Sequence, residues 1–390
     1  MKKRILIVAP YNNGTIGLCS LNLFNAFKQR TDCDVKCVCV HKFANGHNGF
    51  EECESCVSFA APIYLKWLSM LKQIFWLKKI KKQFKPDITI STLFGCSTIN
   101  VLAGGKDFKI GVFHSPHKQA KKEGFLNYFA TLITYYLVYP FLDRLFCVSE
   151  EVRDSLHPFK FIKKEKIKVV YNIHFPDTIR QKSMELIANQ DEMNILSKPT
   201  IIYCGRLDKN KAPDRAIIAF ANSSKPQDAQ LVFIGNDKDN MKESLVNLAK
   251  KYSIENSVHF WGKKENPYPY MRASKALISS SYSEGLPGVM IEALIIGTPI
   301  VATNSSMGVW EICSCANQYN AKLNTIHKCY CGIISSNMGK SQNQLLDLDI
   351  ANLSESISQV FNYEKINNFL FEENIQSSNV IREYLITKKR

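Results

Sequence analysis

Short apolar runs alternate with longer stretches of helical periodicity along the first part of the chain. The first run, residues 5–10, leads into a loop that carries Gly14 and Gly17. Strands that alternate with helices indicate a parallel sheet with helices on its faces. The expected strands of this part are 5–10, 34–40, 87–92, 109–114, 144–149 and 167–172, and the expected helices are 20–29, 64–84 and a segment that ends near 142.

A second series of the same kind begins near residue 199. The pattern therefore predicts an α/β protein of two tandem, doubly wound, Rossmann-like domains. In such sheets a ligand binds beyond the carboxyl ends of the strands, so the expected site is a central cleft that both domains face. The expected strands of this series are 199–205, 230–235, 258–262, 275–281 and 299–304, and the expected helices are 212–221, 240–252, 267–274 and 288–296.

The domain boundaries follow from the composition. Residues 176–198 are polar and irregular, which predicts a linker. We therefore expect a first domain over 1–175 and a second domain over 199–365. The end of the chain, 366–390, is expected to form a C-terminal helix that is able to cross back to the first domain.

The charge of the chain is unevenly distributed. The formal net charge of the 390 residues is +15. Residues 1–185 carry 28 Lys and Arg against 15 Asp and Glu, whereas the remainder carries 22 against 20. A basic surface attracts anions, so nucleic acid, phosphorylated small molecules and an anionic membrane are all candidate partners of the first half.

The segment 65–85 is the most basic, with seven Lys, two Trp and no acidic residue. An ordinary surface helix that covers the sheet is one interpretation. Lysines and aromatic rings also suit an anionic membrane surface, at about 1 kcal/mol per Lys near it, and we expect peripheral contact with such a membrane. No apolar run reaches the length of about 18 residues that spans a bilayer.

The location is inferred from the start of the chain and from its thiols. The first apolar run stops at Pro10, which is too short for a signal peptide. The 13 cysteines are expected to be reduced, because the chain is too long and too rich in core for a disulfide framework. We therefore expect a cytoplasmic protein, at the inner face of the cell membrane where it contacts lipid.

Candidate chemistry begins with the stretch SYSEGLPGVMIEALIIGTPIVAT at 281–303. Glu284 follows an expected strand, a Gly-Leu-Pro-Gly turn comes next, and Glu292 lies about one turn into the expected helix. A helix N-terminus offers free backbone N–H groups, which suit a phosphate. Carboxylates on both sides of a phosphate cradle suit a nucleotide sugar. Acidic residues also favour the first turn of any helix, so this stretch alone leaves the ligand open.

A second stretch, CGRLDKNK at 204–211, follows another expected strand of the same sheet. It places Arg206 and Lys211 at the same edge as Glu284. Two cations can neutralise a departing diphosphate without a metal ion. A solvated loop is the alternative interpretation, because lysines usually lie in such loops.

These stretches, in their order and spacing, resemble one known family. CGRLDKNK, VHFWG, SEGLPGVMIEALIIGTPIVAT and GVWEI (308–312) are closely similar to the C-terminal domain of retaining glycosyltransferases of the GT-B fold, family four, also called glycosyl transferases group 1. The first half is similar more loosely, through the glycine loop, His114, DRLFCVSEEV (143–152) and VVYN (169–172). The resemblance covers most of the chain and is firmest over 200–312.

The resemblance implies a role for individual residues. Arg206 and Lys211 hold the donor diphosphate, Glu284 contacts hydroxyls of the donor sugar, and Glu292 contacts the ribose hydroxyls. His114 lies near the reacting centre and counts, with Arg206, Lys211 and Glu284, among the expected catalytic residues. The expected donor-binding residues are Gly14, Gly17, Gly205, Arg206, Lys211, Gly262, Glu284, Gly285, Leu286, Pro287, Gly288, Val289 and Glu292. Tyr171-Asn172-Ile173-His174 departs from the usual Asn-Gly before an acidic residue.

The resemblance also implies the reaction. A sugar, hexosyl or N-acetylhexosaminyl, moves from a nucleotide sugar to a hydroxyl of a glycan or lipid-linked acceptor, in the synthesis of lipopolysaccharide, capsule or another bacterial surface polysaccharide. UDP is the preferred nucleotide because it is the commonest in such enzymes. The anomeric configuration is retained, and we expect a same-face substitution in which the departing diphosphate helps to deprotonate the acceptor. The enzyme then acts by positioning and charge stabilisation.

Two other functions stay open. An epimerase or phosphorylase of the same fold would act on a related sugar nucleotide or sugar phosphate. A nucleic-acid-binding protein would explain the charge, but the basic residues do not interleave with a recognisable recognition module. We therefore expect no nucleic-acid partner.

No cofactor and no metal ion are expected. Asp-x-Asp pairs can hold a divalent cation on a donor diphosphate, and Asp237 and Asp239 follow a strand, but the same pattern occurs three times in the chain. Zinc sites prefer cysteine pairs separated by two residues. Of Cys53-x-x-Cys56, Cys313-x-Cys315 and Cys329-x-Cys331, only the first has that spacing. Buried free thiols are therefore expected for all three.

Overall fold

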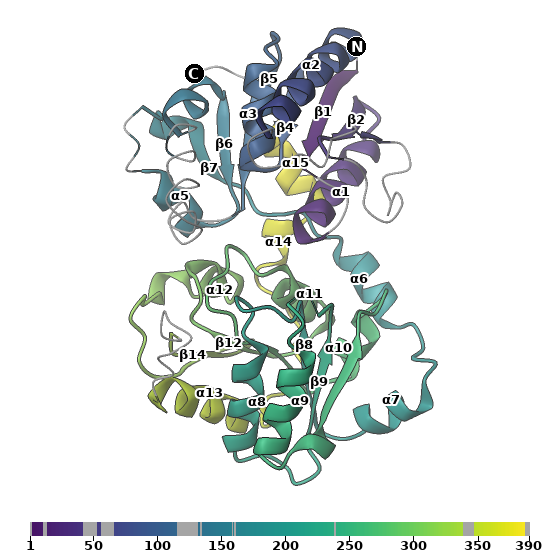
Figure 1. Cartoon of the computed structure of the whole chain (residues 1–390), viewed down its shortest axis with the longest axis vertical. Helices are drawn as coiled ribbons and strands as arrows, with labels where there is room; N and C mark the ends of the chain where they lie inside the picture. Colours follow the sequence, from purple (N-terminus) through teal and green to yellow (C-terminus); the bar gives the residue numbers. More distant parts are fainter. Residues whose placement is uncertain are drawn as a thin grey trace. The chain divides into compact units, whose positions relative to one another are not determined.

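The chain forms two compact units, each built around its own sheet (Figure 1). The first unit comprises residues 1–174 together with 373–390, and the second comprises residues 175–372. The computed structural model describes residues 2–10, 14–41, 53–55, 66–114, 132, 135–157, 159, 161–237, 239–337 and 347–386. Most of the helix expected to end near 142 lies outside these residues, as does Cys56.

The first unit has a seven-stranded parallel sheet in the order β3-β2-β1-β4-β5-β6-β7. The order reverses between β1 and β4, which makes this the switch point of a doubly wound sheet. The central strands are buried on both faces, which explains their continuous apolar runs. The strands are β1 (Lys3–Ala9), β2 (Cys33–Cys39), β3 (Glu54–Ser55), β4 (Ile88–Ser91), β5 (Phe108–Phe113), β6 (Arg144–Cys147) and β7 (Ile167–Val169).

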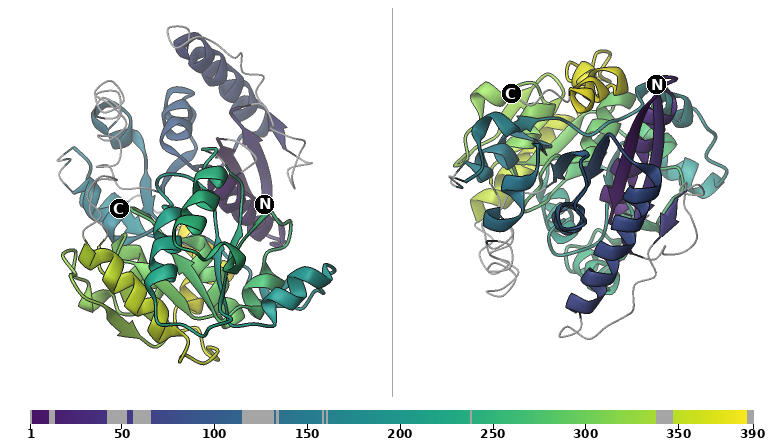
Figure 2. Two further views of the ribbon diagram at one scale, coloured as in Figure 1. Left: turned by 60° about the horizontal axis from the view of Figure 1, so that its bottom comes forward. Right: turned by 90° about the horizontal axis from the view of Figure 1, so that it is seen from above.

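Helices cover both faces of this sheet (Figure 2). On one face, Leu77 of α2 packs in one cluster with Leu6 and Val8 of β1. On the opposite face, the C-terminal helix α15 places Tyr384 against Phe146 of β6, with ring centroids 4.8 Å apart. The helices are α1 (Gly14–Lys28), α2 (Lys66–Phe84), α3 (Phe94–Leu102), α5 (Glu150–Leu156) and α15 (Ser377–Leu385), with 3₁₀ turns at Tyr139–Phe141 and Lys164–Lys166.

The second unit has a seven-stranded sheet in the order β10-β9-β8-β11-β12-β14-β13. Only β13, at the edge, is antiparallel to its neighbour. The order reverses between β8 and β11, again as a doubly wound sheet requires. The strands are β8 (Thr200–Cys204), β9 (Gln230–Ile234), β10 (Val258–Gly262), β11 (Ala276–Ser279), β12 (Ile300–Thr303), β13 (His327–Cys329) and β14 (Gly332–Ser335).

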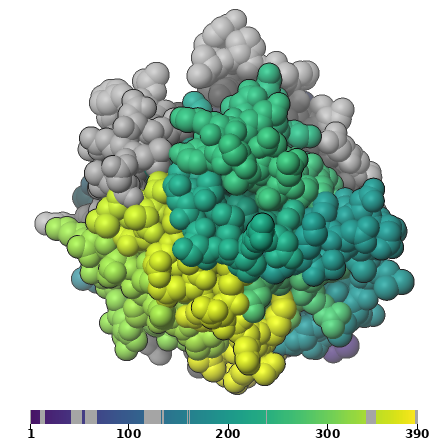
Figure 3. Space-filling model, turned by 90° about the horizontal axis from the view of Figure 1, so that it is seen from below, coloured from purple at the N-terminus to yellow at the C-terminus, as the bar shows by residue number. Residues whose placement is uncertain are grey.

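The helices of the second unit cover its sheet on both faces. In the space-filling view, α13 (yellow-green) lies beside α8, and α8 in turn lies beside α9 (Figure 3). Phe220 of α8 and Leu353 of α13 meet β8 and β9 in one buried apolar cluster. The helices are α6 (Pro176–Ser183), α7 (Gln190–Leu196), α8 (Pro213–Asn222), α9 (Lys242–Lys251), α10 (Tyr268–Ala273), α11 (Gly288–Ile296), α12 (Met307–Ile312), α13 (Asp347–Val360) and α14 (Glu372–Ile375), with 3₁₀ turns at Glu255–Ser257 and Ala316–Gln318.

The segment expected as a linker, 176–198, is helical and belongs to the second unit. Asn189 caps α7, because its Oδ1 accepts hydrogen bonds from the backbone N–H groups of Asp191 and Glu192. The Glu192 carboxylate is buried and lies 2.6 Å from Nζ of Lys264. The prediction of an irregular linker was wrong, because two short polar helices carry little apolar periodicity.

The basic helix α2 places its lysines in two different environments. Lys78, Lys79 and Lys82 are exposed, as are Leu71 and Phe75 on the same helix. Lys81 is buried. Its ammonium lies 2.9 Å from Oδ2 of Asp107 and also donates to backbone carbonyls, and burial lowers its pKa to about 8. Among the described residues, no helix is both long enough and apolar enough to cross a membrane.

Candidate active site

The loop after β8 is organised by a buried acid, Asp208. Its Oδ2 accepts a hydrogen bond of 2.7 Å from Nε of Arg206, and its Oδ1 accepts one of 2.9 Å from the backbone N–H of Lys211. The side chain of Arg206 is 49% exposed, whereas that of Asp208 is 6% exposed. The terminal nitrogens of the Arg206 guanidinium therefore remain available to a ligand. Asp208 was not among the predicted site residues, although its place in the DKNK turn is typical of a turn-stabilising carboxylate.

Lys211 and Glu284 are brought together by the ends of two neighbouring strands, β8 and β11. Nζ of Lys211 lies 2.6 Å from Oε1 of Glu284, and both side chains are largely buried. Two further bonds hold the loops in register. Nδ2 of Asn210 donates to the carbonyl of Ser283 at 2.9 Å, and the backbone N–H of Tyr282 donates to the carbonyl of Asn210 at 2.9 Å. The expected convergence of these two strand ends is therefore observed.

The turn after Glu284 leads into the N-terminus of α11. Pro287 is the N-cap residue and has no side-chain cap. The first N–H groups of a helix, here those of Gly288 and Val289, have no partner within the helix and carry partial positive charge. At the other end Gly297 stops the helix in the left-handed conformation, with φ of +89°. Gly285 and Leu286 lie in the turn before Pro287, in the places that the sequence indicated.

Glu292 projects from the second turn of α11. Burial raises the pKa of its carboxyl to about 7, and a hydrogen bond from Tyr268 opposes this rise. The same burial raises the pKa of the Tyr268 phenol. The Glu292 carboxyl therefore keeps its proton to a higher pH than an exposed glutamate does. Glu292 was predicted from the sequence, but its hydrogen-bond partner Tyr268 was not. Tyr268 begins α10, and no sequence signal links it to Glu292.

Glycines permit close backbone contacts around these loops. A Cβ on Gly235 would lie 1.7 Å from the carbonyl oxygen of Gly205. Gly262, expected at the donor site, accepts a hydrogen bond of 2.9 Å from the N–H of Gly235. A Cβ on Gly308 would lie 2.1 Å from the carbonyl oxygen of Gly285. Gly235 and Gly308 are therefore structural supports of the site that the sequence analysis did not recognise.

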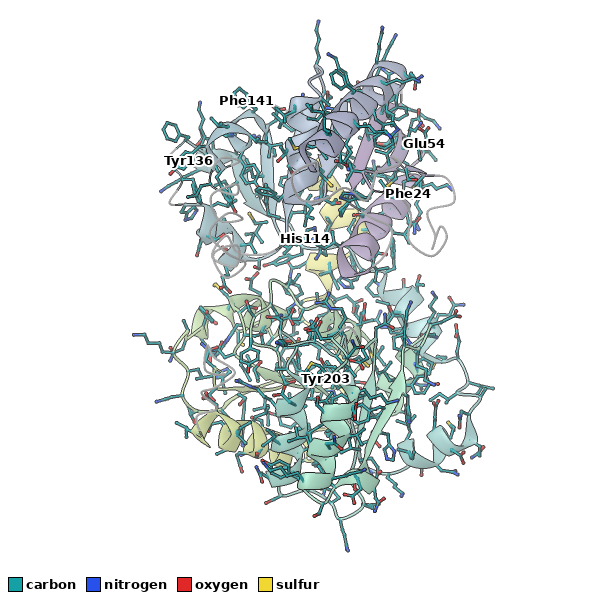
Figure 4. The ribbon with its side chains drawn as sticks, viewed as in Figure 1. Phe24, Glu54, His114, Tyr136, Phe141 and Tyr203 are labelled. Carbon is teal, nitrogen blue, oxygen red and sulfur yellow. The ribbon has the colours of Figure 1, made fainter. Side chains whose placement is uncertain are left out.

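Three expected site residues belong to the first unit. Gly14 begins α1, and Gly17 is buried in its first turn. His114 follows β5 at the carboxyl edge of the sheet (Figure 4). Its Nε2 is buried and has no hydrogen-bond partner among the described residues. Burial lowers the pKa of His114 to about 4, so its imidazole is neutral at pH 7.

The first unit also contains an apolar cavity of about 330 Å³ at this carboxyl edge. Most of its surface is apolar, and the side chains of His41 and Gln73 are among its polar groups. Gln73 Nε2 donates to the carbonyl of Val40 at 2.9 Å, which fixes the wall between α2 and β2. The lining residues are Pro10, Val40, His41, Met70, Gln73, Leu93, Phe94, Gly95, Cys96, Thr98 and Ile99.

The acidic pair after β9 has a structural role in its loop. The carboxylate of Asp237 accepts hydrogen bonds of 2.7 and 3.1 Å from the backbone N–H groups of Met241 and Lys242, at the start of α9. Oδ2 of Asp239 accepts a bond of 3.3 Å from the backbone N–H of Lys209. These bonds explain why acidic residues occur at this strand end.

Two family models match the chain, one in each half. The model "Glycosyltransferase Family 4" matches residues 21–173, and the model "Glycosyl transferases group 1" matches residues 188–320. Together they cover both units. The second match contains Arg206, Lys211, Glu284 and Glu292, which are the residues of the strand-end loops described above.

The chain is also similar in sequence to proteins named as glycosyltransferases. The chain is 28% identical over 260 residues to an uncharacterized glycosyltransferase, MJ1059, of Methanocaldococcus jannaschii, a match that covers 64% of the chain and 63% of that protein. It is 27% identical over 301 residues to the GalNAc-alpha-(1->4)-GalNAc-alpha-(1->3)-diNAcBac-PP-undecaprenol alpha-1,4-N-acetyl-D-galactosaminyltransferase of Campylobacter jejuni, covering 75% of the chain and 77% of the relative. The chain thus spans under two thirds of the first relative.

The fold has solved counterparts. The structure of Alr3699/HepE of Anabaena in complex with UDP and glucose superposes with a TM-score of 0.67, covers 98% of both chains and shares 14% sequence identity. At that identity the likeness establishes the fold, two Rossmann-like domains of the GT-B class. With both family models, the chain belongs to the family-four GT-B glycosyltransferases, as the sequence predicted.

Proposed function

We propose that the protein transfers a hexosyl or N-acetylhexosaminyl group from a UDP-sugar to a hydroxyl of a glycan or lipid-linked acceptor. The transfer retains the anomeric configuration and uses no metal ion at the donor site. The observation that carries this proposal is the Lys211–Glu284 pair, 2.6 Å apart, directly before the N-terminus of α11. It places a cation, a carboxylate and free backbone N–H groups at one sheet edge.

The donor diphosphate is neutralised by Lys211 and Arg206. Asp208 engages only Nε of Arg206, so the two terminal nitrogens can bind phosphate oxygens as a fork. Lys211 is already held by Glu284, and a phosphate that approaches the ammonium adds a second anionic partner to it. Preorganised cations of this kind stabilise the charge that develops on the leaving diphosphate.

The two carboxylates bind hydroxyls at the two ends of the donor. Oε1 of Glu284 accepts from Lys211, which leaves Oε2 to accept from a hydroxyl of the sugar. Glu292 accepts from the ribose hydroxyls when it is ionised, and its pKa of about 7 makes that interaction depend on pH. His114 of the first unit is neutral at pH 7, and a role near the reacting centre stays what the family resemblance implies for it.

Retention requires no protein nucleophile in this proposal. The diphosphate departs from the anomeric carbon while the acceptor hydroxyl attacks the same face, and the hydroxyl proton passes to a diphosphate oxygen. The C–O bond to the diphosphate breaks and the C–O bond to the acceptor forms. The protein supplies orientation and charge stabilisation.

The first unit is assigned the acceptor. The Campylobacter relative is named for an undecaprenol-linked substrate, and the apolar cavity between α2, α3 and β2 offers a wall for an apolar part of an acceptor. On α2, Leu68, Leu71 and Phe75 are exposed and lie near the exposed Lys78, Lys79 and Lys82. Exposed apolar and cationic groups on one helix suit a membrane with anionic lipids.

A melting scan with UDP, GDP and ADP, each free and sugar-linked, tests the donor. A ligand at about 100 times its Kd adds about 2.7 kcal/mol to the free energy of unfolding. We expect a shift with UDP and one UDP-sugar that EDTA does not remove. A shift with GDP or ADP instead would mean that this nucleotide, and not UDP, carries the donor sugar. A shift that vanishes with EDTA and returns with Mg²⁺ or Mn²⁺ would contradict metal independence. No shift with any nucleotide would contradict the donor site itself.

A further inference from the structure

Two Cys-x-Cys pairs, from α12 and from the β13–β14 hairpin, lie close together in the second unit. Cys313 directly follows α12, Cys329 ends β13, and Cys331 lies in the turn to β14. The Sγ atoms of these three lie within 4.8 Å of one another, and those of Cys329 and Cys331 are 3.5 Å apart. Cys315 is not in this group of three, but it lies two residues after Cys313 on the same bend of the chain. The sequence predicted separate buried thiols, and this clustering is what it missed.

The backbone is bent at both Cys-x-Cys pairs. Ser314, between Cys313 and Cys315, has φ of +54°, a left-handed conformation that costs a non-glycine residue about 1–2 kcal/mol. The N–H of Cys315 donates to the carbonyl of Trp310 at 3.0 Å, which turns the chain back on α12. The N–H of Ser314 also donates to the carbonyl of Glu311, so this bend is the C-terminal cap of α12 and fixes the backbone that carries Cys313 and Cys315.

The hairpin that carries the other two thiols is equally fixed. Cys329 pairs with Gly332 across a turn of two residues. Gly332 has φ of +146°, and a Cβ there would lie 2.0 Å from the carbonyl oxygen of Ile300. The hairpin is thereby seated against β12, and Cys331 is fully buried.

The sulfur positions fit a metal ion better than a disulfide. A disulfide requires about 2.05 Å between sulfurs, whereas Cys329 and Cys331 are 3.5 Å apart. A zinc–sulfur bond of about 2.3 Å makes the edge of a tetrahedron of four sulfurs roughly 3.8 Å. Cys313, Cys315 and Cys331 are each at most 6% exposed. Cys329 is partly buried. A largely buried set of soft thiolate ligands selects zinc among the common divalent ions.

A metal ion binds the deprotonated form of a thiol, so zinc would replace the protons of the cysteines that hold it. Zinc binding at this cluster is therefore expected to be tighter at higher pH.

We propose that Cys313, Cys329 and Cys331 bind one zinc ion, and that Cys315, two residues after Cys313, supplies the fourth thiolate of a structural site. Binding forms four Zn–S bonds and releases the thiol protons to solvent, without oxidation or reduction. The second pair lies beyond residue 320, where the match to the family model ends.

The proposed site supports the donor loops indirectly. It joins the C-terminus of α12 to the β13–β14 hairpin. Gly308, in the first turn of α12, packs against the carbonyl of Gly285 in the loop that carries Glu284. A zinc ion at the other end of α12 thus positions a helix that touches the donor loop, and it takes no part in the transfer itself.

The first test is the metal content of the full-length wild-type chain, purified under reducing conditions and measured by plasma mass spectrometry. We expect about one zinc per chain. Replacement by Co²⁺ should give the intense absorption of a tetrahedral cobalt thiolate. Cys313→Ser and Cys329→Ser should each lower the zinc content at least fivefold, whereas Cys33→Ser, at a thiol of β2, should leave it unchanged.

The wild-type measurement decides the matter even where a variant does not fold. A wild-type chain without zinc that takes up neither Zn²⁺ nor Co²⁺ would overturn the proposal. So would full zinc content in Cys329→Ser, or disulfides between these cysteines under reducing purification. The donor test is independent: removal of zinc lowers the melting temperature without nucleotide, whereas failure of the donor site abolishes only the shift that nucleotide causes.

Discussion

Lys211 Nζ lies 2.6 Å from Glu284 Oε1, and this contact connects the carboxyl ends of β8 and β11 across the switch point of the second sheet. The two side chains are 22% and 12% exposed, so water screens the pair only partly. The pair holds the cation that the proposed reaction needs, next to the N-terminus of α11. Its removal should therefore affect catalysis more than folding.

Lys211→Ala is expected to lower kcat by about 10²–10³, the effect of removing one preorganised charge from a leaving group. The melting temperature should change by only a few degrees, because the loop keeps the bonds that Asp208 and Asn210 make. Steady-state kinetics and thermal unfolding measure the two effects. Lys209→Ala, at an exposed lysine of the same loop, is the matched control. Normal turnover in Lys211→Ala would remove this lysine from the site.

Glu292→Gln is expected to change how stability depends on pH. Burial raises the pKa of Glu292 from 4.5 to about 7. Between these values the unfolded chain releases the proton and the folded chain retains it, so the contribution of Glu292 to the free energy of unfolding falls as the pH rises. Each pKa unit corresponds to about 1.4 kcal/mol. Because the Glu292 side chain is partly exposed, water reduces the free-energy cost of its ionisation in the folded protein. We therefore expect Glu292→Gln to be about 1–3 kcal/mol more stable than the parent at pH 8.

Urea unfolding at pH 5 and pH 8 measures this difference. At pH 5 the parent carboxyl is protonated and the two proteins should be similar in stability. Glu292→Gln should also bind UDP about tenfold more weakly at pH 8, where the parent carboxylate is ionised. Equal stability at both pH values would show that the carboxyl is solvated, and equal UDP affinity would exclude the contact with ribose.

Gly308→Ala is expected to displace the donor loop. The added Cβ would meet the Gly285 carbonyl oxygen at 2.1 Å, and both groups belong to backbone that has to move apart. We expect at least a tenfold loss of UDP affinity, measured by calorimetry, in a protein that remains folded by circular dichroism. Gly95→Ala, where nothing lies within 4 Å of the new Cβ, should leave UDP affinity unchanged. Unaltered affinity in Gly308→Ala would mean that α12 does not position the loop.

Charge reversal on α2 is expected to weaken binding to anionic membranes. Lys78, Lys79 and Lys82 are exposed, whereas Lys81 is buried against Asp107 and has to be left in place. The triple change to Glu should reduce sedimentation with anionic liposomes at least tenfold at low salt, with little change in melting temperature. The control reverses Lys242, Lys250 and Lys251 of α9, which changes the net charge equally. Equal effects of both triples would indicate net charge rather than a contact through α2.

The fold could be predicted well where apolar runs are long. The strands from β8 to β12 lie within two residues of the expected ranges, because all except the partly buried edge strand β10 are largely apolar runs buried on both faces. The hairpin β13–β14 was not predicted. Its first strand, His327–Cys329, is short and polar and is defined only by pairing with Gly332–Ser335. Helices α6 and α7 were missed for the same reason, since tertiary contacts and a cap define them.

The candidate site could be predicted in part. Arg206, Lys211, Glu284 and Glu292 follow strand ends within recognisable stretches, so sequence order alone places them at one edge. Asp208, Tyr268 and Gly308 depend on contacts between distant segments, and no local pattern shows such contacts. The four cysteines show this most clearly. Their Cys-x-Cys spacings argue against zinc when each pair is considered alone, and only the fold brings the two pairs together.

The return of α15 to the first unit has a consequence for the order of events during synthesis. The second unit is continuous in sequence, from residue 175 to residue 372, and all of its strands have been made before α15 exists. The first unit is different, because Tyr384 fills the space beside Phe27 and Phe146. On the ribosome, the part of the chain that is made first is therefore the last to complete its core, because α15 is made only after the whole of the second unit.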